Sequence, residues 1–498
     1  MKVFISYPPL DNGKGVPLLS QNRQFQWFNS PTYIYPVVPA YAATLLKQNG
    51  FKVVWDDAIA EEMSYAGWLE RVRNEKPDVI AIETKTPVVK MHWQIIDSLK
   101  QEFGDRLKVV LMGDHVTALP EESLENSKAD FIITGGDYDF LLLSLCKSLR
   151  SVKPLASPLA PGIWYREGSL IKNSGKSLLN NNLDTLPMID RTLTKWKLYG
   201  VKNGNFKRTP GAYTMAGRDC WWGRCSFCSW TTLYPGKNFR AISPEKLLDE
   251  IGVLIEKHGV REVFDDSGSF PTGKWLEAFC KGMISRGYNK RIYMGCNMRI
   301  NALRKEEYEL MAKAGFRFVL FGLESVNQAT LDKLDKGLKV AQIVEGFRMA
   351  KKAGLEPHVT SMIGYPWEEK KDAEETINFA KDMFRKGYID TLQATIVVPY
   401  PGTPMYEESK KNGWLITEDW ERYDMRESVW KSPLSNDDVK MLTQGLYKAA
   451  LNPQFIARKI FSVRNIDDLR FLFMAGRKLM AHLTDFKVKG KKAVGINS

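Results

Sequence analysis

The chain has 498 residues and a formal net charge of +13; 44% of its residues are hydrophobic and 26% are charged, as in ordinary globular proteins of two to four domains. It lacks the apolar run of roughly eighteen residues that a transmembrane helix needs, and six cysteines in so long a chain do not predict a disulfide framework. The charge fits an acidic electron donor, an anionic membrane surface or a generally basic surface, and because no nucleic-acid-binding motif accompanies it, we expect no nucleic acid as partner.

Residues 1–150 alternate between short apolar strands and helices. The expected strands are residues 2–6, 52–57, 78–83, 108–114 and 130–135, and the helices between them include residues 38–48 and 91–103. This alternation predicts a doubly wound parallel sheet, Rossmann-like, with helices on both faces. Ligands of such sheets bind at the carboxyl ends of the strands. The first strand lacks the features of a signal peptide, so we expect a cytoplasmic protein.

The segment after the fourth strand reads Gly113-Asp114-His115-Val116-Thr117-Ala118-Leu119-Pro120-Glu121-Glu122. It resembles the Gly-Gly-x-His-x-Thr-x-x-Pro-Glu-Glu segment of the cobalamin-binding domain that precedes many radical SAM cores. The fifth strand of that family ends in Gly-Glu-Gly-Glu, where this chain departs with Gly135-Gly136-Asp137-Tyr138-Asp139. The resemblance implies that cobalamin binds along Pro8, Thr84, Gly113, His115, Thr117, Gly135 and Asp137.

The segment Asp-x-His-x-x-Gly, which supplies a histidine to cobalt in other corrinoid proteins, is absent from the sequence. We therefore expect no histidine on the lower face of cobalt. The alternative for His115 is a helix-capping or hydrogen-bonded loop histidine. The alternative for residues 1–150 is a nucleotide-type fold with a degenerate site, because this fold serves many ligands.

Residues 151–210 predict a linker across the joint between two domains. Residues 162–166 and 170–172 predict a small hairpin around Glu167 and Gly168. The segment Leu183-Asp184-Thr185-Leu186-Pro187 resembles the Leu-Asp-x-Leu-Pro segment that precedes the core in radical SAM proteins. We expect a positional role for this linker.

Three of the six cysteines, Cys220, Cys225 and Cys228, fall within nine positions. Thiolates at this spacing suit zinc or an iron–sulfur cluster. A structural zinc ion needs a fourth ligand, which the flanks do not offer close by. Three thiolates can hold three irons of a 4Fe–4S cluster and leave the fourth iron open to a substrate. The alternatives are three buried thiols, or a zinc site completed from far away.

This stretch resembles the cluster loop of radical SAM enzymes, which has three residues and then two between its cysteines and an aromatic residue before the last one. Phe227 fills the aromatic position. The first gap here, residues 221–224, is one residue too long, so the loop must bulge. The resemblance implies that Cys220, Cys225 and Cys228 bind a 4Fe–4S cluster.

Residues 211–410 predict a partial (β/α)6 barrel. Its strands are residues 212–216, 262–266, 291–297, 316–324, 356–364 and 391–399. Its helices are residues 244–258, 275–286, 305–314, 340–353 and 371–386, the first of them with Ser243 as N-cap. Functional residues of barrels gather at the carboxyl ends of the strands.

The residues found at these strand ends resemble the SAM-binding residues of the family. The resemblance assigns to SAM the residues Asp265, Asp266, Ser267, Asn297, Arg299, Glu324, Gly364 and Pro399. Asp265 to Ser267 would lie near the amino group, Glu324 would bind the ribose or the amino group, and Gly364 would allow close approach of adenine. The alternative for Glu324 is an ordinary salt-bridge partner.

The remaining cysteines and the aromatic residues near the site carry weaker signals. Cys146, Cys280 and Cys296 are expected to be small buried hydrophobic residues, with Cys296 near the site. The aromatic residues that could wall a hydrophobic substrate space, or pack the loop against the barrel, are Trp221, Trp222, Tyr365, Trp367 and Tyr400.

Residues 411–498 predict a helical region with helices over residues 437–451 and 467–483. The second helix is apolar at Leu469, Leu472, Phe473, Leu479 and Met480, with Lys487, Lys489, Lys491 and Lys492 beyond it. One interpretation is a packing helix with a solvated basic end. The other is peripheral contact of this helix with an anionic membrane, which would fit a lipid substrate.

The sequence thus predicts a cobalamin-dependent radical SAM enzyme that methylates an unactivated carbon of a small molecule or lipid. The resemblance implies SAM, a 4Fe–4S cluster and cobalamin as cofactors, and a flavodoxin- or ferredoxin-type electron donor. A cyclase or rearrangement enzyme with the same cofactors is the first alternative. A non-catalytic corrinoid- and cluster-binding sensor and a zinc-stabilised scaffold are the others.

Overall fold

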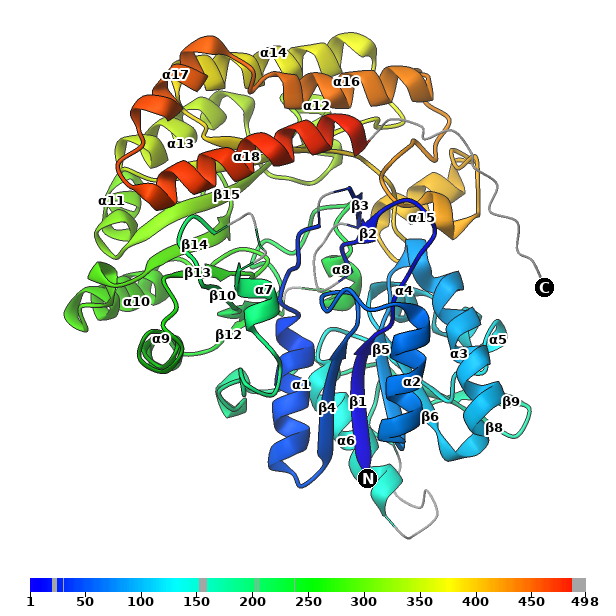
Figure 1. Ribbon diagram of the computed structural model, residues 1–498. Helices are drawn as coiled ribbons and strands as arrows, with labels where there is room; N and C mark the ends of the chain where they lie inside the picture. Colours follow the sequence, from blue (N-terminus) through cyan, green and yellow to red (C-terminus); the bar gives the residue numbers. More distant parts are fainter. Residues whose placement is uncertain are drawn as a thin grey trace.

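The computed structural model of the chain describes residues 1–19, 25–29, 31–151, 159–201, 203, 206–236 and 238–485. Its N-terminal part contains a seven-stranded sheet (Figure 1). In spatial order the strands are β4 (Lys52–Asp57), β1 (Lys2–Tyr7), β5 (Val79–Glu83), β6 (Lys108–Met112), β7 (Phe131–Ile133), β8 (Ile163–Glu167) and β9 (Leu170–Asn173). The first five are parallel, in the order 2-1-3-4-5 of doubly wound folds, and the hairpin β8–β9 adds antiparallel strands at one edge.

Helices cover both faces of this sheet because its strands are apolar on both sides. Val3 and Ile5 of β1 belong to the core beneath α1 (Val37–Gln48) and α6 (Tyr138–Arg150). Phe4 points the other way, into the core beneath α2 (Tyr65–Glu75) and α3 (Val89–Phe103). Two short helices, α4 (Asp114–Ala118) and α5 (Pro120–Glu125), follow β6 at the carboxyl edge.

A second sheet has six parallel strands in chain order. They are β10 (Gly211–Thr214), β13 (Glu262–Asp265), β14 (Tyr293–Met298), β15 (Phe316–Glu324), β16 (Glu356–Ile363) and β17 (Thr391–Ile396). The helices that connect them are α9 (Pro244–His258), α10 (Lys274–Ser285), α11 (Lys305–Lys313), α12 (Gln328–Lys333), α13 (Val340–Lys352) and α14 (Lys370–Lys386). The predicted fold class, a Rossmann-like sheet followed by a partial barrel, is confirmed.

The predicted linker, residues 151–210, supplies the hairpin β8–β9 to the N-terminal sheet, and its residues 152–158 lie outside the described residues. The hairpin was expected, whereas its pairing with β7 was not. The divisions at residues 150, 210 and 410 stay predictions.

The C-terminal part is helical, with α15 (Pro404–Lys411), α16 (Asn436–Lys448), α17 (Pro453–Phe461) and α18 (Ile466–Asp485). The sequence analysis missed α17, although its start is signalled: the Asn452 side chain accepts a hydrogen bond from the Phe455 amide at 3.1 Å, and Pro453 is the first helical residue. The lysines expected at 487, 489, 491 and 492 lie outside the described residues. No described helix has both the length and the apolar character needed to cross a bilayer.

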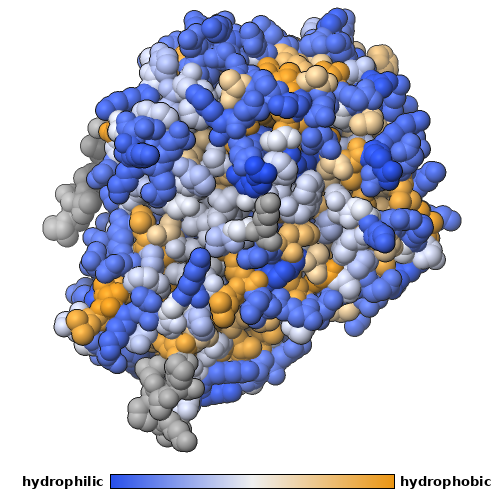
Figure 2. Space-filling model, turned by 180° about the vertical axis from the view of Figure 1, so that it is seen from behind, coloured by the Kyte–Doolittle hydropathy of each residue, from blue (hydrophilic) through white to orange (hydrophobic). Residues whose placement is uncertain are grey.

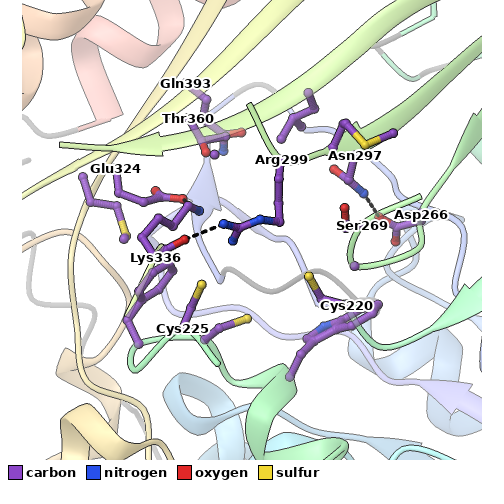
Figure 3. A pocket seen from close by; sticks show the side chains of 18 of the residues that line it. Cys220, Cys225, Asp266, Ser269, Asn297, Arg299, Glu324, Lys336, Thr360 and Gln393 are labelled. Carbon is purple, nitrogen blue, oxygen red and sulfur yellow. Dashed lines mark hydrogen bonds and ion pairs between the residues drawn. The ribbon is translucent and has the colours of Figure 1, made fainter. Parts of the chain in front are cut away.

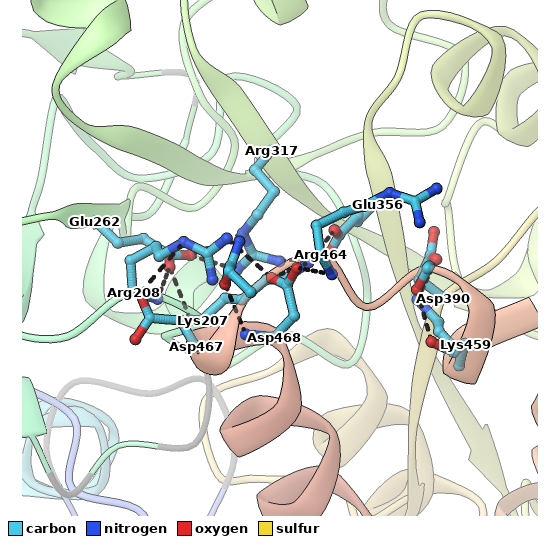
Figure 4. Close-up of polar contacts among 12 residues, drawn as sticks. Lys207, Arg208, Glu262, Arg317, Glu356, Asp390, Lys459, Arg464, Asp467 and Asp468 are labelled. Carbon is cyan, nitrogen blue, oxygen red and sulfur yellow. Dashed lines mark hydrogen bonds and ion pairs between the residues drawn. The ribbon is translucent and has the colours of Figure 1, made fainter.

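A network of ion pairs closes the amino-terminal end of the barrel (Figure 4). Arg317 of β15 pairs with Glu262 of β13 and with Glu356 of β16. Asp468 at the start of α18 accepts a hydrogen bond from Arg208 at 2.9 Å. Lys207 lies 3.1 Å from Glu356 and 3.4 Å from Asp468, and thereby links the helix to the barrel floor.

Candidate active site

A cavity of about 200 Å³ lies between the cysteine loop and the carboxyl ends of the barrel strands. All three predicted cluster cysteines, Cys220, Cys225 and Cys228, line it. Of the other residues assigned to cluster and SAM, those that line it are Phe227, Asp266, Asn297, Arg299 and Glu324. Figure 3 shows Cys220 and Cys225 on one side and Asp266, Asn297, Arg299 and Glu324 across from them. The assigned residues that do not line it are Asp265, Ser267, Gly364 and Pro399.

The long first gap between cysteines is accommodated by a bulge in the loop. Asp219 and Gly223 both take positive φ angles, of 77° and 56°. The bulge turns Trp222 onto the segment after α12, where its indole donates to the carbonyl of Asp335 at 2.7 Å. The Arg299 guanidinium lies 3.9 Å from the centre of the Trp222 ring. The extra residue is therefore used to attach the loop to the barrel.

Asp265 and Ser267 support the cysteine loop from beneath and do not line the cavity. The buried Asp265 carboxylate accepts hydrogen bonds from the Thr214 hydroxyl and the Ala216 amide, both at 2.8 Å. The Ser267 hydroxyl donates to Asp265 and accepts from the Gly217 amide at 2.8 Å. Burial raises the pKa of Asp265, which these hydrogen bonds partly offset. The assignment of both residues to SAM stays a prediction.

Gly268 lets the end of β13 touch the cysteine loop. A Cβ atom on this residue would lie 2.8 Å from the Cys220 amide nitrogen and 2.9 Å from the Cys220 Cβ. Any larger residue would displace the loop, so glycine is required here by close approach.

Next to this contact lies a group of short polar side chains. The Asn297 amide donates to the Ser267 carbonyl at 2.9 Å and lies 3.4 Å from an Asp266 carboxylate oxygen. The hydroxyl of Ser269 is buried, lines the cavity and has no hydrogen-bond partner in the described part of the chain. A buried hydroxyl without a partner carries a desolvation cost that a bound polar ligand would relieve. The set suits the N–H groups of an amine.

Two cations, Arg299 and Lys336, face the same cavity. Lys336 donates to the Glu324 carboxylate at 2.8 Å, and Arg299 donates to the Lys336 carbonyl at 2.7 Å. Burial alone would lower the pKa of Lys336, but the Glu324 carboxylate raises it above its ordinary value, so Lys336 stays charged. Glu324 has a positive φ of 67° at an irregularity in the β15–β16 pairing, which turns its side chain toward Lys336.

This ion pair is the alternative that we gave for Glu324, and it leaves its role in SAM binding a prediction. Sequence analysis missed Lys336, which lies in the loop after α12 and belongs to no motif. Ser269 stands in the segment Asp265–Phe270, which resembles the segment near the SAM amino group, but only Asp265, Asp266 and Ser267 of that segment were assigned to SAM.

The surroundings of Cys225 favour its protonated thiol. Burial raises the pKa of Cys225 to about 11. Iron binds the thiolate, so loading of the loop must release protons. Within the described residues no three Cys, His, Asp or Glu side chains converge on one point as the ligands of a single ion would. A 4Fe–4S cluster makes no such demand, since each of its irons takes one thiolate.

Below the polar groups, the cavity continues into the barrel lumen between the aromatic rings of Tyr213, Phe264 and Phe318. His358 of β16 lines this part and shares a hydrogen bond of 2.8 Å between its Nδ1 and the Thr391 hydroxyl. Its Nε2 is buried and has no partner among the described residues. Burial lowers the pKa of His358 to about 4, so the ring is neutral at physiological pH.

The residues assigned to cobalamin lie at the carboxyl edge of the N-terminal sheet, and several are engaged with one another. A Cβ atom on Gly113 would lie 2.2 Å from the Thr84 carbonyl oxygen. The Thr117 hydroxyl donates to the Gly113 carbonyl at 2.6 Å and accepts from the Gly135 amide at 3.0 Å. Pro8 follows β1 at the same edge. These contacts give the edge a fixed shape.

His115 is a buried, hydrogen-bonded loop histidine. Its Nδ1 lies 3.1 Å from the Thr86 hydroxyl and its Nε2 lies 3.1 Å from the Glu122 carboxylate. Both ring nitrogens are thus occupied, which is the alternative that we stated for this residue. Trp420, from the segment after the barrel, packs against the ring at 5.4 Å.

The unusual end of the fifth strand contacts the cysteine loop. Asp137 pairs with Arg218 at 3.1 Å and with Arg240 at 2.7 Å, and Asp139 also pairs with Arg218, which it contacts with both carboxylate oxygens. Asp137, Asp139 and Arg218 are buried, and Arg218 lies two residues before Cys220. This network joins the N-terminal sheet directly to the cysteine loop, a role that the departure from Gly-Glu-Gly-Glu did not reveal.

The weaker sequence signals have simple outcomes. Cys146, Cys280 and Cys296 are buried, as expected. Of the five aromatic residues named as candidates for a substrate wall, only Tyr400 lines this cavity. Trp221 donates to the Phe270 carbonyl at 3.2 Å, and Tyr365 stacks on Trp367 with ring centres 5.6 Å apart, so these residues pack the barrel end.

The profile of the radical SAM superfamily matches residues 216–380, from the cysteine loop through most of α14. The chain therefore contains a radical SAM domain over these residues. Over 432 residues it is 26% identical to an uncharacterized methyltransferase, PH0819, of Pyrococcus horikoshii, covering 86% of this chain and 90% of that one. It is also 26% identical to the anaerobic magnesium-protoporphyrin IX monomethyl ester cyclase of Cereibacter sphaeroides, covering 82% of this chain and 64% of the cyclase.

Among solved structures, the radical SAM methyltransferase TsrM of Kitasatospora setae, with cobalamin and a [4Fe-4S] cluster bound, is similar in fold. The TM-score is 0.62 at 14% identity, and the match covers 82% of this chain and 75% of TsrM. The match extends well beyond residues 216–380, because it covers 82% of this chain.

Proposed function

We propose that this chain is a cobalamin-dependent radical SAM methyltransferase that acts on an unactivated carbon. The observation that carries the proposal is the single cavity in which three thiols of one loop face a set of acidic, amide and cationic side chains at the barrel strand ends. The fold shared with a cobalamin-binding methyltransferase and the identity to a protein named as a methyltransferase support it.

The residues present fit the cofactors that the proposal requires. Cys220, Cys225 and Cys228 would each hold one iron of a 4Fe–4S cluster and leave the fourth iron to the amine and carboxylate of SAM. The Ser269 hydroxyl, which has no partner among the described residues, and the neighbouring Asp266 suit the N–H groups of that amine. When bound, the cluster supplies the electron that cleaves SAM to a 5′-deoxyadenosyl radical, and cobalamin supplies the methyl group.

The protein's own contribution is to hold charge and exclude water. Arg299 is anchored by the Lys336 carbonyl and by the face of Trp222, which fixes its guanidinium beside the cavity as a partner for the SAM carboxylate. Lys336 adds a second positive charge that Glu324 maintains. The aromatic lumen beneath keeps water from the carbon that would react.

The N-terminal sheet would hold cobalamin at its carboxyl edge, where Thr84, Gly113 and Thr117 form a rigid surface. The buried pairs from Asp137 and Asp139 to Arg218 fix that edge relative to Cys220. The two cofactor sites are thereby held in register, as transfer between them requires.

The substrate class follows from the lumen. Its walls are mostly aromatic and aliphatic, and the polar side chains among them are Thr360, Gln393 and the neutral His358, whose Nε2 has no partner among the described residues. An uncharged, largely apolar substrate portion that carries a few hydrogen-bonding groups would fit. A formal net charge of +13 suits an acidic flavodoxin- or ferredoxin-type electron donor.

A cyclase with the same cofactors is the second candidate, because the relative from Cereibacter sphaeroides carries that name over 82% of this chain. The two candidates differ in the fate of the methyl group. Methyl transfer from labelled SAM to a product occurs only in the first.

The deciding experiment measures 5′-deoxyadenosine formed from SAM by anaerobically reconstituted protein with a strong reductant. We expect product from the wild type, none from Cys225→Ala, and wild-type yield from Cys280→Ala, which removes a buried thiol far from the loop. Iron and bound SAM are quantified in each sample. If iron and SAM are bound and no product forms even with candidate apolar substrates and a flavodoxin, the non-catalytic sensor is correct. If zinc is bound in place of iron, the scaffold is correct.

A further inference from the structure

Seven large apolar side chains project from the last two helices into solvent. They are Ile456, Ile460 and Phe461 of α17 and Ile466, Leu469, Phe473 and Met480 of α18. Phe461 is 78% exposed, Ile466 74% and Phe473 67%. We call this set the α17–α18 outer face. Burying such side chains would be favourable, so their exposure in adjacent helices calls for an explanation.

The orientation of α18 is fixed by its inner side, so the exposure is not the result of a loosely placed helix. Asp468 is buried and paired with Arg208, and Asp467 pairs with Arg261. His482 stacks on Tyr447 with ring centres 5.2 Å apart. Figure 1 shows α18 lying across the outside of the barrel beside α16, which carries Tyr447.

The charges of α18 are sorted between its two sides. Its first acidic residues, Asp467 and Asp468, face the barrel and are neutralised there by arginines. Arg470 and Arg477 are exposed between the apolar residues of the outer face. The Arg477 guanidinium lies 6.0 Å from the centre of the Phe473 ring. The outer face between residues 456 and 480 is therefore apolar and cationic, and it presents no acidic side chain.

We infer that the α17–α18 outer face rests on an anionic lipid bilayer. Apolar side chains at the acyl boundary with arginines at the headgroups form the pattern of helices that lie in a membrane interface. A second copy of this chain fits worse, because a two-fold contact would place Arg470 and Arg477 against the same arginines. A peptide partner usually needs a groove, whereas this face is a row of projecting side chains.

The opposite side of the molecule differs from the α17–α18 outer face. Figure 2 shows that side as mostly hydrophilic, with apolar residues in separate groups between charged ones. The inference concerns location and is independent of the proposed function, since vesicle binding requires neither SAM nor turnover.

The test is co-sedimentation of the full, anaerobically reconstituted chain with phosphatidylcholine vesicles, with and without phosphatidylglycerol. We expect binding to the anionic vesicles that weakens as salt is raised. Leu469→Ser with Phe473→Ser should lower the vesicle affinity about tenfold, because both side chains lose apolar burial. Reversing Arg470 and Arg477 to glutamate should lower it at least roughly fivefold per residue.

Matched controls are Leu178→Ser, an exposed leucine of the 151–210 segment, and Arg304→Glu, whose side chain is 81% exposed on the barrel. Both should bind as the wild type does. A chain that stops at residue 485 separates the outer face from the lysines beyond it. Absence of wild-type binding would overturn the inference, as would unchanged binding of both outer-face variants. It is also overturned if only the shortened chain loses binding, or if the outer face variants merely convert a dimer to a monomer in sedimentation analysis.

Discussion

Replacement of Arg218 by methionine would test whether the two cofactor-binding regions are held together by buried charge. Arg218 is 1% exposed and contacts both carboxylate oxygens of Asp139, which is 0% exposed. Asp137 lies 3.1 Å away but keeps its pairs with Arg240. In Arg218→Met, Asp139 would therefore remain buried with only the Phe140 amide, at 2.9 Å, as a donor.

The cost follows from that isolation. Breaking a buried ion pair by removing one partner typically costs about 3–5 kcal/mol, because the remaining charge stays buried without compensation. At about 2–4 °C per kcal/mol for domains of this size, the midpoint of thermal unfolding should fall on the order of 10 °C. The loss should be largest at neutral pH and smaller in acid, where Asp139 can take up a proton, since burial already raises its pKa.

Two further variants isolate the buried charge. Arg224→Met removes another arginine of the same loop, whose partner Asp335 lies 2.9 Å away. Because the Arg224 side chain is 46% exposed, this variant should lower the free energy of unfolding by less than about 1 kcal/mol. Asp139→Asn in the Arg218→Met background removes the unpaired charge and should restore much of the midpoint. Differential scanning calorimetry on reconstituted protein measures all three.

A fall no larger than that of Arg224→Met would contradict this reasoning. So would a double variant as unstable as Arg218→Met, because the penalty would then not come from Asp139. The electron paramagnetic resonance spectrum of the reduced cluster provides a second measurement, which should change in Arg218→Met if the pair positions the loop beside Cys220.

Three other predictions concern the cavity and the N-terminal sheet. Lys336→Met should keep the iron content and weaken SAM binding roughly tenfold in equilibrium dialysis, because about one charge-assisted hydrogen bond is lost. Unchanged affinity would exclude Lys336 from the SAM site. His358→Phe should keep 5′-deoxyadenosine formation without substrate and lose methyl transfer to an apolar substrate, whereas equal transfer would show that the lumen is not the substrate site. Glu83 is buried, and mainly for this reason its pKa is raised from 4.5 to about 7. The folded state should therefore lose stability as the pH rises from about 4.5 to about 7, and Glu83→Gln should gain on the order of 3 kcal/mol over the wild type across that window in denaturant unfolding. A pH-independent difference between the two proteins would refute this.

The fold could be predicted largely from the sequence because each element carries local signals. Apolar strands of three to nine residues alternate with helices in both sheets, so the parallel arrangement of the strands followed from the alternation. Some observed strand ends differ from the predicted ones by a few residues: β6 stops at Met112 and β7 at Ile133, earlier than expected. The pairing of β8 with β7 could not be predicted, since it depends on which edge of the sheet is free.

The site was predicted only in part because motifs mark positions in the chain and not contacts across it. Cys220, Cys225 and Cys228 are adjacent in sequence and were found by spacing. Lys336 and His358 enter the cavity from different strands and loops with no pattern around them. Asp265 was found, yet it supports the loop from below, which depends on Thr214 and Ala216 in a neighbouring strand.

The charged floor of the barrel also has a consequence in time. Arg208, which precedes the first barrel strand, finds its partner Asp468 only 260 positions later in the chain. At a synthesis rate of about 5–20 residues per second, roughly 10 to 50 seconds separate the emergence of the two side chains from a ribosome. During that interval all six strands can exist while the ion pairs from α18 to the floor do not. The nascent barrel is thus held in an incomplete state until the last helix arrives, and a delay in its arrival prolongs the period in which the unfinished chain can aggregate.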